Sequence, residues 1–81
     1  MRYIYIIHSL STPGRFYPGI TRDFHRRLNE HNEGKSTYTS KYLPWEPVVT
    51  VRFQNDKAAY QFEKYLKSGS GRAFAKKHFV K

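Results

Sequence analysis

Three ionisable side chains interrupt two helical patterns that are otherwise apolar. Arg27 and His31 lie on one helical stripe, and Glu63 lies on another. The two stripes are Phe24, Arg27, Leu28 and His31, and Ala59, Phe62, Glu63 and Leu66. An amphipathic helix normally buries its stripe against a sheet, and burying unpaired charge is costly. The pattern therefore predicts a polar pocket between both helices and a sheet, where these groups converge on one another, on water or on a ligand.

Tyrosines near the start of the chain could complete that pocket. Tyr3 and Tyr5 are two residues apart, so in a strand they point to the same face, and Tyr17 could project beside them from a neighbouring strand. Tyrosine hydroxyls, an arginine, a histidine and a single carboxylate suit phosphodiester hydrolysis. Glu63 would hold one Mg²⁺ or Mn²⁺, Arg27 would neutralise phosphoryl charge, and a tyrosine would position or deprotonate water.

Strands are expected where β-branched and aromatic residues cluster. Residues 2–8 form one such segment, apolar on both faces, which is typical of the middle of a sheet. A turn over residues 9–14 leads to a second strand over residues 15–20, making a hairpin. Pro18 cannot donate a ladder hydrogen bond, so this second strand is expected at an edge. A third strand is predicted over residues 47–53.

Capping residues indicate where the first helix begins and ends. Thr21 is a candidate N-cap, and Asp23 would complement the helix dipole from the first turn. The helix is expected to run to about Asn32 and to stop at Gly34. It would present Arg27 to the sheet.

Two further helices are expected after the third strand. One begins after a cap at Asn55 or Asp56 and ends near Lys67, and a short one over residues 72–79 could be capped by Ser70. The predicted fold is α+β, with a three-stranded antiparallel sheet flanked by helices in the order β-β-α-β-α-α. The whole chain, residues 1–81, is expected to form a single domain.

Composition narrows the class of partner. The chain has 81 residues and a net charge of +9 at pH 7, which favours a polyanion over a neutral ligand. No apolar run approaches the roughly 20 residues that span a bilayer, so nucleic acid is expected as the partner and not a membrane. There is no cysteine, which excludes disulfides, thiol catalysis and thiolate zinc sites. The short apolar segment after the first residues does not resemble a signal peptide, and a cytoplasmic location is expected.

The order of these residues resembles the GIY-YIG nuclease family. That family is named for two tripeptides on adjacent strands, and this chain has Tyr-Ile-Tyr at 3–5 and Tyr-Pro-Gly at 17–19. Arg27 stands ten residues after the start of the second tripeptide, where the family keeps its catalytic arginine. His31 stands where relatives carry tyrosine or histidine, and Glu63 stands at the metal-ligand position. The resemblance implies the family's fold, one divalent ion and cleavage of DNA.

Within this family the chain resembles small stand-alone proteins that are similar to the nuclease domain of the bacterial (UvrC-type) excision-repair endonuclease. The mechanisms of family members differ in which tyrosine acts as the general base, so the resemblance assigns Tyr5 and Tyr17 to that role jointly. The chain departs from the family at Tyr3, which replaces a glycine, and at Pro18 in the second tripeptide. At Ile20 some relatives have a lysine near the base.

Seven residues are candidates for contact with nucleic acid. Cations and hydroxyls in the loop after the first helix could bind phosphates, an aromatic ring there could stack on bases, and a basic face could form near the C-terminus. They are Lys35, Ser36, Thr39, Lys41, Tyr42, Arg72 and Lys76. The alternative is a solvated loop and a non-specific basic surface. Residues 34–37 have the Gly-Lys-Ser sequence that ends a phosphate-binding P-loop. The motif also requires a glycine five residues earlier, where this chain has Asn29, so no nucleoside triphosphate is expected.

The leading hypothesis is a metal-dependent endonuclease that hydrolyses phosphodiester bonds in DNA, leaning to single-stranded, flapped or damaged substrates. The alternative is a non-catalytic nucleic-acid-binding module on the same fold, and a protein-interaction adaptor is a third possibility. Structural roles also remain open for the individual residues. Tyr5 could be a core tyrosine, Arg27 and Glu63 could form a salt bridge, and His31 could complement a helix dipole. The oligomeric state stays open.

Overall fold

The sheet has three antiparallel strands in the order β2-β1-β3. The computed structural model describes residues 1–79 of the chain. Strand β1 (Arg2–Ser9) pairs on one side with β2 (Phe16–Thr21) and on the other with β3 (Trp45–Phe53). The predictions of a central first strand and of an edge strand containing Pro18 are both confirmed. The third strand begins two residues earlier than expected, at Trp45.

The register of the hairpin decides which side chains share a face. Tyr5 lies opposite Gly19, and Ile7 lies opposite Tyr17. Because successive side chains of a strand alternate between faces, Tyr5 and Tyr17 project from one face, and Ile4 projects from the other. The prediction that Tyr17 projects beside Tyr5 is therefore confirmed.

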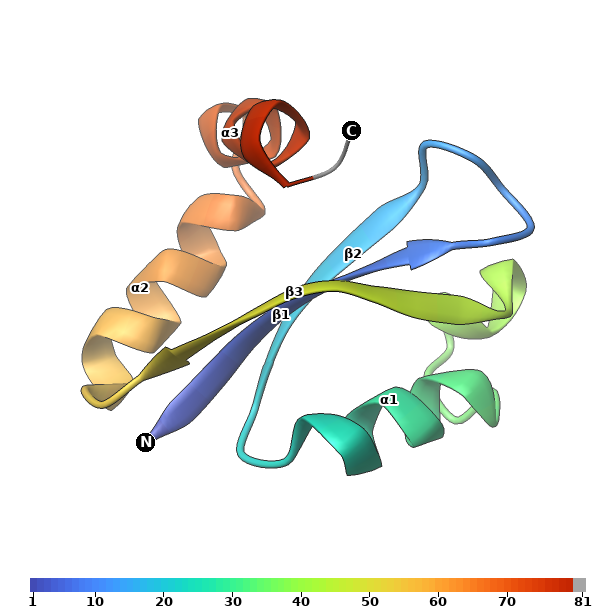
Figure 1. Ribbon diagram of the computed structural model, residues 1–81, viewed down its shortest axis with the longest axis horizontal. Helices are drawn as coiled ribbons and strands as arrows, with labels where there is room; N and C mark the ends of the chain where they lie inside the picture. Colours follow the sequence, from blue (N-terminus) through green and yellow to red (C-terminus); the bar gives the residue numbers. More distant parts are fainter. Residues whose placement is uncertain (80–81) are drawn as a thin grey trace.

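The helices lie on both sides of the sheet. Helix α1 (Phe24–Asn32) covers one face, while α2 (Asp56–Leu66) and α3 (Gly69–His78) cover the other (Figure 1). A 3₁₀ turn, η1 (Thr39–Tyr42), lies within the expected loop. The expected pocket between both helices and the sheet does not form as one space, because the sheet lies between α1 and α2 (Figure 1). None of the helices formed within residues 1–79 is long and apolar enough to cross a bilayer.

The helix caps correct two details of the sequence interpretation. Asp23, and not Thr21, is the N-cap of α1, because its side chain accepts a hydrogen bond from the backbone N–H of Arg26. Thr21 holds the preceding turn, where its hydroxyl accepts from the Asp23 N–H. Asn55, one of the two residues expected, caps α2. Ser68, and not Ser70, caps α3, so that this helix begins immediately after α2.

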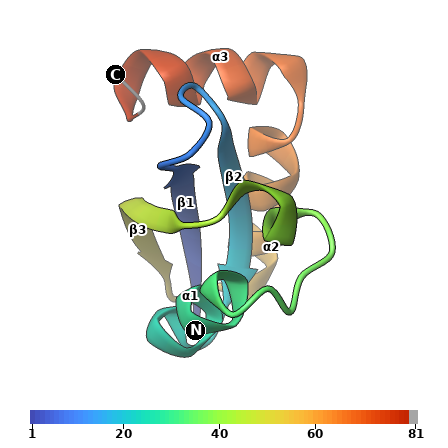
Figure 2. The ribbon, with the colours of Figure 1, turned by 90° about the vertical axis from the view of Figure 1, so that its right-hand side faces the viewer.

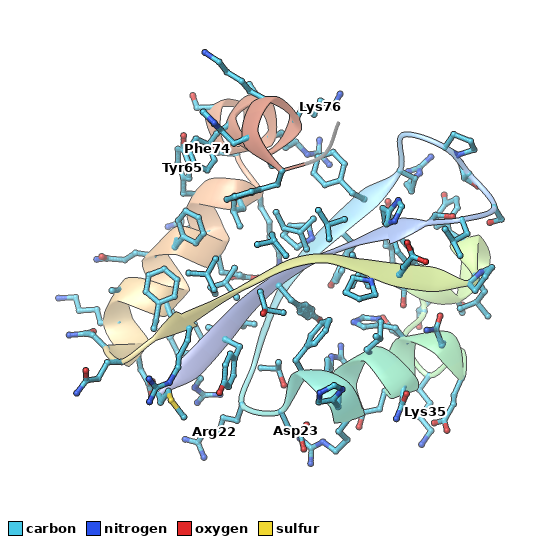
Figure 3. The ribbon with its side chains drawn as sticks, in the orientation of Figure 1. Arg22, Asp23, Lys35, Tyr65, Phe74 and Lys76 are labelled. Atoms are coloured by element: carbon cyan, nitrogen blue, oxygen red, sulfur yellow. The ribbon has the colours of Figure 1, made fainter. Side chains whose placement is uncertain are left out.

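The hydrophobic core lies between the sheet and the α2–α3 pair. Its buried members are Ile4, Ile6, Ala59, Leu66 and Ala75, and partly buried phenylalanine, valine and isoleucine side chains pack against them. Where α2 meets α3, the rings of Tyr65 and Phe74 pack edge to face with centroids 6.0 Å apart (Figure 3). A Cβ atom at Gly71 would overlap the backbone of Tyr65, so glycine permits the close approach of the two helices. This layer fixes the position of α2, which carries Glu63.

Candidate active site

A chain of hydrogen bonds runs through the face of the sheet that α1 covers. The Tyr5 hydroxyl lies 2.8 Å from Nε2 of His31, and Nδ1 of His31 lies 2.7 Å from the Thr39 hydroxyl. All three side chains are buried, with Tyr5 exposed by only 1% and the other two not at all. Each hydroxyl can donate or accept, so either neutral tautomer of His31 satisfies both contacts. The chain joins strand β1 to helix α1 and to η1.

His31 is a neutral imidazole at physiological pH. Burial, followed by the positive charge of Arg27, lowers its pKa from 6.5 to about 4. A cation that complements the dipole at the end of α1 would need the opposite shift, so that interpretation of His31 is wrong. The imidazole is instead a polar core group that orients the Tyr5 hydroxyl.

Tyr5 is enclosed because its cross-strand neighbour is a glycine. A Cβ atom at Gly19 would overlap the Tyr5 ring, so the ring lies directly over the β2 backbone. Burial raises the pKa of Tyr5. The Arg27 side chain opposes this increase, and the charges of Tyr17 and Glu63 add to it. The hydroxyl of Tyr5 therefore stays protonated more firmly than that of a tyrosine in water.

Trp45 anchors the segment that supplies Thr39. Its indole N–H donates to the Thr39 carbonyl at 2.8 Å, and its side chain is buried. Asn32 binds the Trp45 backbone on both sides, accepting from the N–H at 2.7 Å and donating to the carbonyl at 3.1 Å. These contacts fix η1 against the start of β3. They also place the Trp45 side chain in the core beneath the loop.

Arg27 projects from α1 toward the Tyr5 hydroxyl, where it influences the pKa of that residue. Its guanidinium donates to Glu30 at 3.0 Å, one turn further along the same helix. The alternative of a structural Arg27–Glu63 salt bridge is therefore wrong. Arg27 is about one-third exposed, so a phosphate could reach its free donors.

Glu63 approaches from the other side of the sheet. It is 17% exposed and forms an ion pair with Lys67, one turn further along α2. The hydrogen bond to Glu63, and to a smaller extent the nearby Tyr17, raises the pKa of Lys67. Residues 1–79 contain no cluster of three histidine or acidic residues able to hold a metal. A single carboxylate fits Mg²⁺, which keeps most of its waters and takes phosphate oxygens as further ligands.

Tyr17 connects the two halves of the site at the edge of the sheet. Its ring lies 5.5 Å from the His31 ring on the α1 side. It also lines a hollow together with Lys67, which reaches across from α2. Since β2 is the edge strand, groups from both faces of the sheet meet around it. The structure thus brings Tyr5, Arg27 and His31 into one cluster, with Tyr17 between that cluster and the Glu63–Lys67 pair.

The seven candidate nucleic-acid contacts divide into three groups. The prediction that Thr39 binds phosphate is wrong, because its side chain is fully buried against His31. Arg72 and Lys76 line hollows beside the β1–β2 loop. The remaining four lie in or around the segment before β3: Lys35, Ser36, Lys41 and Tyr42. Figure 3 shows Lys35 beyond the end of α1 and Lys76 on α3, on opposite sides of the sheet.

Sequence reasoning missed the supporting roles of Thr39, Asn32 and Lys67. Lys67 could have been found, because it stands four residues after Glu63 on the same helix. Thr39 and Asn32 gave no such signal, since their partners lie 8 and 13 residues away across irregular structure.

Comparison with known proteins agrees with this geometry. Residues 1–77 match the family model described as the GIY-YIG catalytic domain. UPF0213 protein SAG0778 of Streptococcus agalactiae is 33% identical over 72 residues, which cover 88% of this chain and 80% of that protein. UPF0213 protein YazA of Bacillus subtilis is 38% identical over 53 residues, covering 64% of this chain and 54% of YazA.

A third relative has an activity in its name. Structure-specific endonuclease subunit slx1 of Xenopus laevis is 44% identical over 55 residues, which cover 62% of this chain but only 20% of that subunit. The family match spans almost the whole chain and includes both tripeptides, α1 and α2. The chain therefore belongs to the GIY-YIG family of nuclease domains.

Proposed function

We propose that this protein is a metal-dependent endonuclease that hydrolyses phosphodiester bonds in DNA. The observation that carries the proposal is the meeting of two polar clusters around β2: Tyr5, Arg27 and His31 on one side, and Glu63 with Lys67 on the other. The relative named as an endonuclease subunit supports the same chemistry. The charge of +9 supports a polyanionic substrate.

The structure favours different roles for the two tyrosines. Tyr5 is buried, its hydroxyl is bound to His31, and its pKa is raised, so it is poorly suited to take a proton from water. Tyr17 is half-buried and lines an open hollow beside Lys67. We therefore assign Tyr17 as the general base. We assign Tyr5 a positioning role, with its hydroxyl held in place by the hydrogen bond to His31.

Glu63 is the residue that would hold the divalent ion, either Mg²⁺ or Mn²⁺. When bound, the ion would supply charge stabilisation at the scissile phosphate. Arg27 would share in neutralising the charge that develops on the phosphoryl oxygens, using donors that Glu30 leaves free. Lys67 would leave Glu63 and remain beside Tyr17, where its ammonium group favours a phosphate.

Cleavage assays with matched variants test this proposal. The wild type should cut single-stranded, flapped or duplex DNA only when Mg²⁺ or Mn²⁺ is present, with a preference for unpaired or flapped substrates. Glu63→Gln and Tyr17→Phe should each lower the rate by at least about 100-fold. Glu33→Gln is the control, because Glu33 is an exposed carboxylate paired with Lys35. Cleavage by Glu63→Gln at the wild-type rate would refute the assigned site.

One observation favours a non-catalytic alternative. Lys67 already neutralises Glu63, as expected in a domain that only binds nucleic acid. Such a module would bind DNA with a strong salt dependence but would cut none of the substrates in either metal. Its affinity would be unchanged in Glu63→Gln. The same assays therefore separate the two functions.

A further inference from the structure

A groove leads away from Tyr17 along the molecule. It begins as a hollow of about 310 Å³ beside Tyr17 and Lys67. A second hollow of about 320 Å³ shares Phe16, Tyr38 and Arg72 with the first and extends to the β1–β2 loop. Figure 2 shows the segment between α1 and η1 (green), which includes Tyr38, passing outside the β2 edge. The groove therefore opens at one end on the candidate base.

The walls of this groove are positively charged. Arg15 contributes from the end of the β1–β2 loop, Lys67 from the C-cap of α2, and Arg72 and Lys76 from α3. Within the described part of the chain, none of the residues that line the two hollows is acidic. A groove with several cations and no carboxylate attracts a chain of phosphates, each of which releases counterions on binding.

An aromatic ring stands where the two hollows meet. Tyr38 is 41% exposed, although it is fixed on several sides. Its ring lies 5.6 Å from the Tyr17 ring and 5.4 Å from the Tyr42 ring. Its hydroxyl accepts a hydrogen bond from Arg15 at 3.0 Å, and the Arg15 guanidinium lies 4.3 Å from the centre of the Tyr42 ring. An exposed ring held in this way can stack on a base with little loss of side-chain entropy.

We propose that this groove binds an unpaired strand of the substrate, with a base stacked on Tyr38 and phosphates on Arg72 and Lys76. The bases of a duplex are stacked inside the helix and cannot lie on Tyr38, whereas those of a single strand can. The strand would leave the cutting site past Tyr17 and follow the groove toward the β1–β2 loop. This inference rests on the proposed function, because it concerns the strand that enters the same site.

Binding measured in EDTA separates this inference from catalysis. Fluorescence anisotropy with a labelled oligothymidylate, and with a labelled duplex, reports affinity whether or not the protein cuts. Tyr38→Ala should weaken single-strand binding roughly 10- to 100-fold and leave duplex binding unchanged, while Tyr38→Phe should retain the affinity. Tyr60→Ala is the matched control, because Tyr60 is a similarly exposed tyrosine (48%) on α2 and lines neither hollow.

A second variant tests the phosphate contacts. Arg72→Gln should weaken binding and reduce the magnitude of the log–log salt slope by about 0.7 for a single strand. A Tyr38→Ala protein that binds the oligothymidylate within about 3-fold of the wild type would overturn the proposal, since stacking on a base is worth more. Equal weakening of single-strand and duplex binding would overturn it too, and so would an equal effect of Tyr60→Ala. If binding follows the proposal but no metal supports cleavage, the groove stands and the endonuclease proposal fails.

Discussion

The wild-type protein is expected to lose stability in mild acid because of His31, and replacing His31 with glutamine should prevent most of that loss. In the folded protein the pKa of His31 is about 4, against an ordinary value of 6.5. As the pH falls below 6.5, the unfolded chain takes up a proton at His31, but the folded chain does not until the pH nears 4. Protonation therefore stabilises the unfolded state, and folding stability falls with pH through this window.

The difference between the two pKa values, roughly 2.5 pH units, fixes the size of the effect. At about 1.4 kcal/mol for each unit, His31 should reduce the free energy of unfolding by about 3 kcal/mol between pH 6.5 and pH 4. Above pH 6.5 both states hold a neutral imidazole, and this contribution disappears. For a small domain, such a loss is a large part of the total stability.

Urea unfolding followed by fluorescence of the single tryptophan, Trp45, measures the effect. Titrations at several values between about pH 7.5 and about pH 4.5 give the free energy of unfolding of each protein. His31→Gln should be less stable than the wild type at neutral pH, because the side chain that joins Tyr5 to Thr39 is changed. Its stability should nevertheless fall much less with pH. His78→Gln, at an exposed histidine of α3, should follow the wild type.

Carboxylates do not obscure this comparison. Arg27 lowers the pKa of Glu30, and the terminal amine lowers that of Asp56, so both groups lose stabilising contacts as the pH falls. The loss at Asp56 occurs in the wild type and in His31→Gln alike and cancels in the difference between the two. Glu30 also acts on His31, but its charge raises the pKa of His31 by less than burial and Arg27 lower it. Parallel stability curves for the two proteins between about pH 6.5 and about pH 4.5 would refute the reasoning, because His31 would then take up its proton in the folded state.

Two further substitutions test other parts of the site. Gly19→Ala places a Cβ atom on the Tyr5 ring and should destabilise the protein by about 1–3 kcal/mol in urea unfolding, whereas Gly69→Ala, with open space around it, should not. Equal stability of the two variants would contradict the close approach at Gly19. Lys67→Met removes the cation that neutralises Glu63 and should tighten Mn²⁺ binding, measured by calorimetry, by roughly 3- to 10-fold. Unchanged Mn²⁺ affinity would show that the ion pair does not compete with the metal.

The order of elements could be predicted because local signals agreed with the final structure. The β-branched and aromatic residues of β1, apolar on both faces, indicated a central strand, and Pro18 indicated an edge strand. The caps of α1 and α3 were less predictable, since neighbouring residues of similar chemistry compete for each position. Asp23 lies closer to the first turn than Thr21, and Ser68 bonds to the backbone N–H of Gly71 where Ser70 had been expected to cap the helix.

The composition of the site was easier to predict than its geometry. The helical stripes identified Arg27, His31 and Glu63 as polar groups on apolar faces. In the structure His31 is buried, Glu63 is 17% exposed, and Arg27 lies close enough to Tyr5 to lower its pKa. Periodicity cannot say which face of a sheet a helix covers, so the separation of α1 from α2 was missed. Thr39 was assigned to phosphate because a polar loop residue is usually exposed, but His31 offers it a buried hydrogen-bond partner.

The position of β2 explains how one small sheet can carry a site with parts on both faces. A central strand would separate the Tyr5–His31 cluster from Glu63 completely, whereas an edge strand lets a substrate reach groups on either side. An open edge also invites pairing with a strand from another chain. Pro18 has no N–H to offer such a strand, and the segment carrying Tyr38 passes beside this edge. A proline in the second tripeptide therefore disfavours pairing of this edge with another strand, so this departure from the family pattern is compatible with the proposed site.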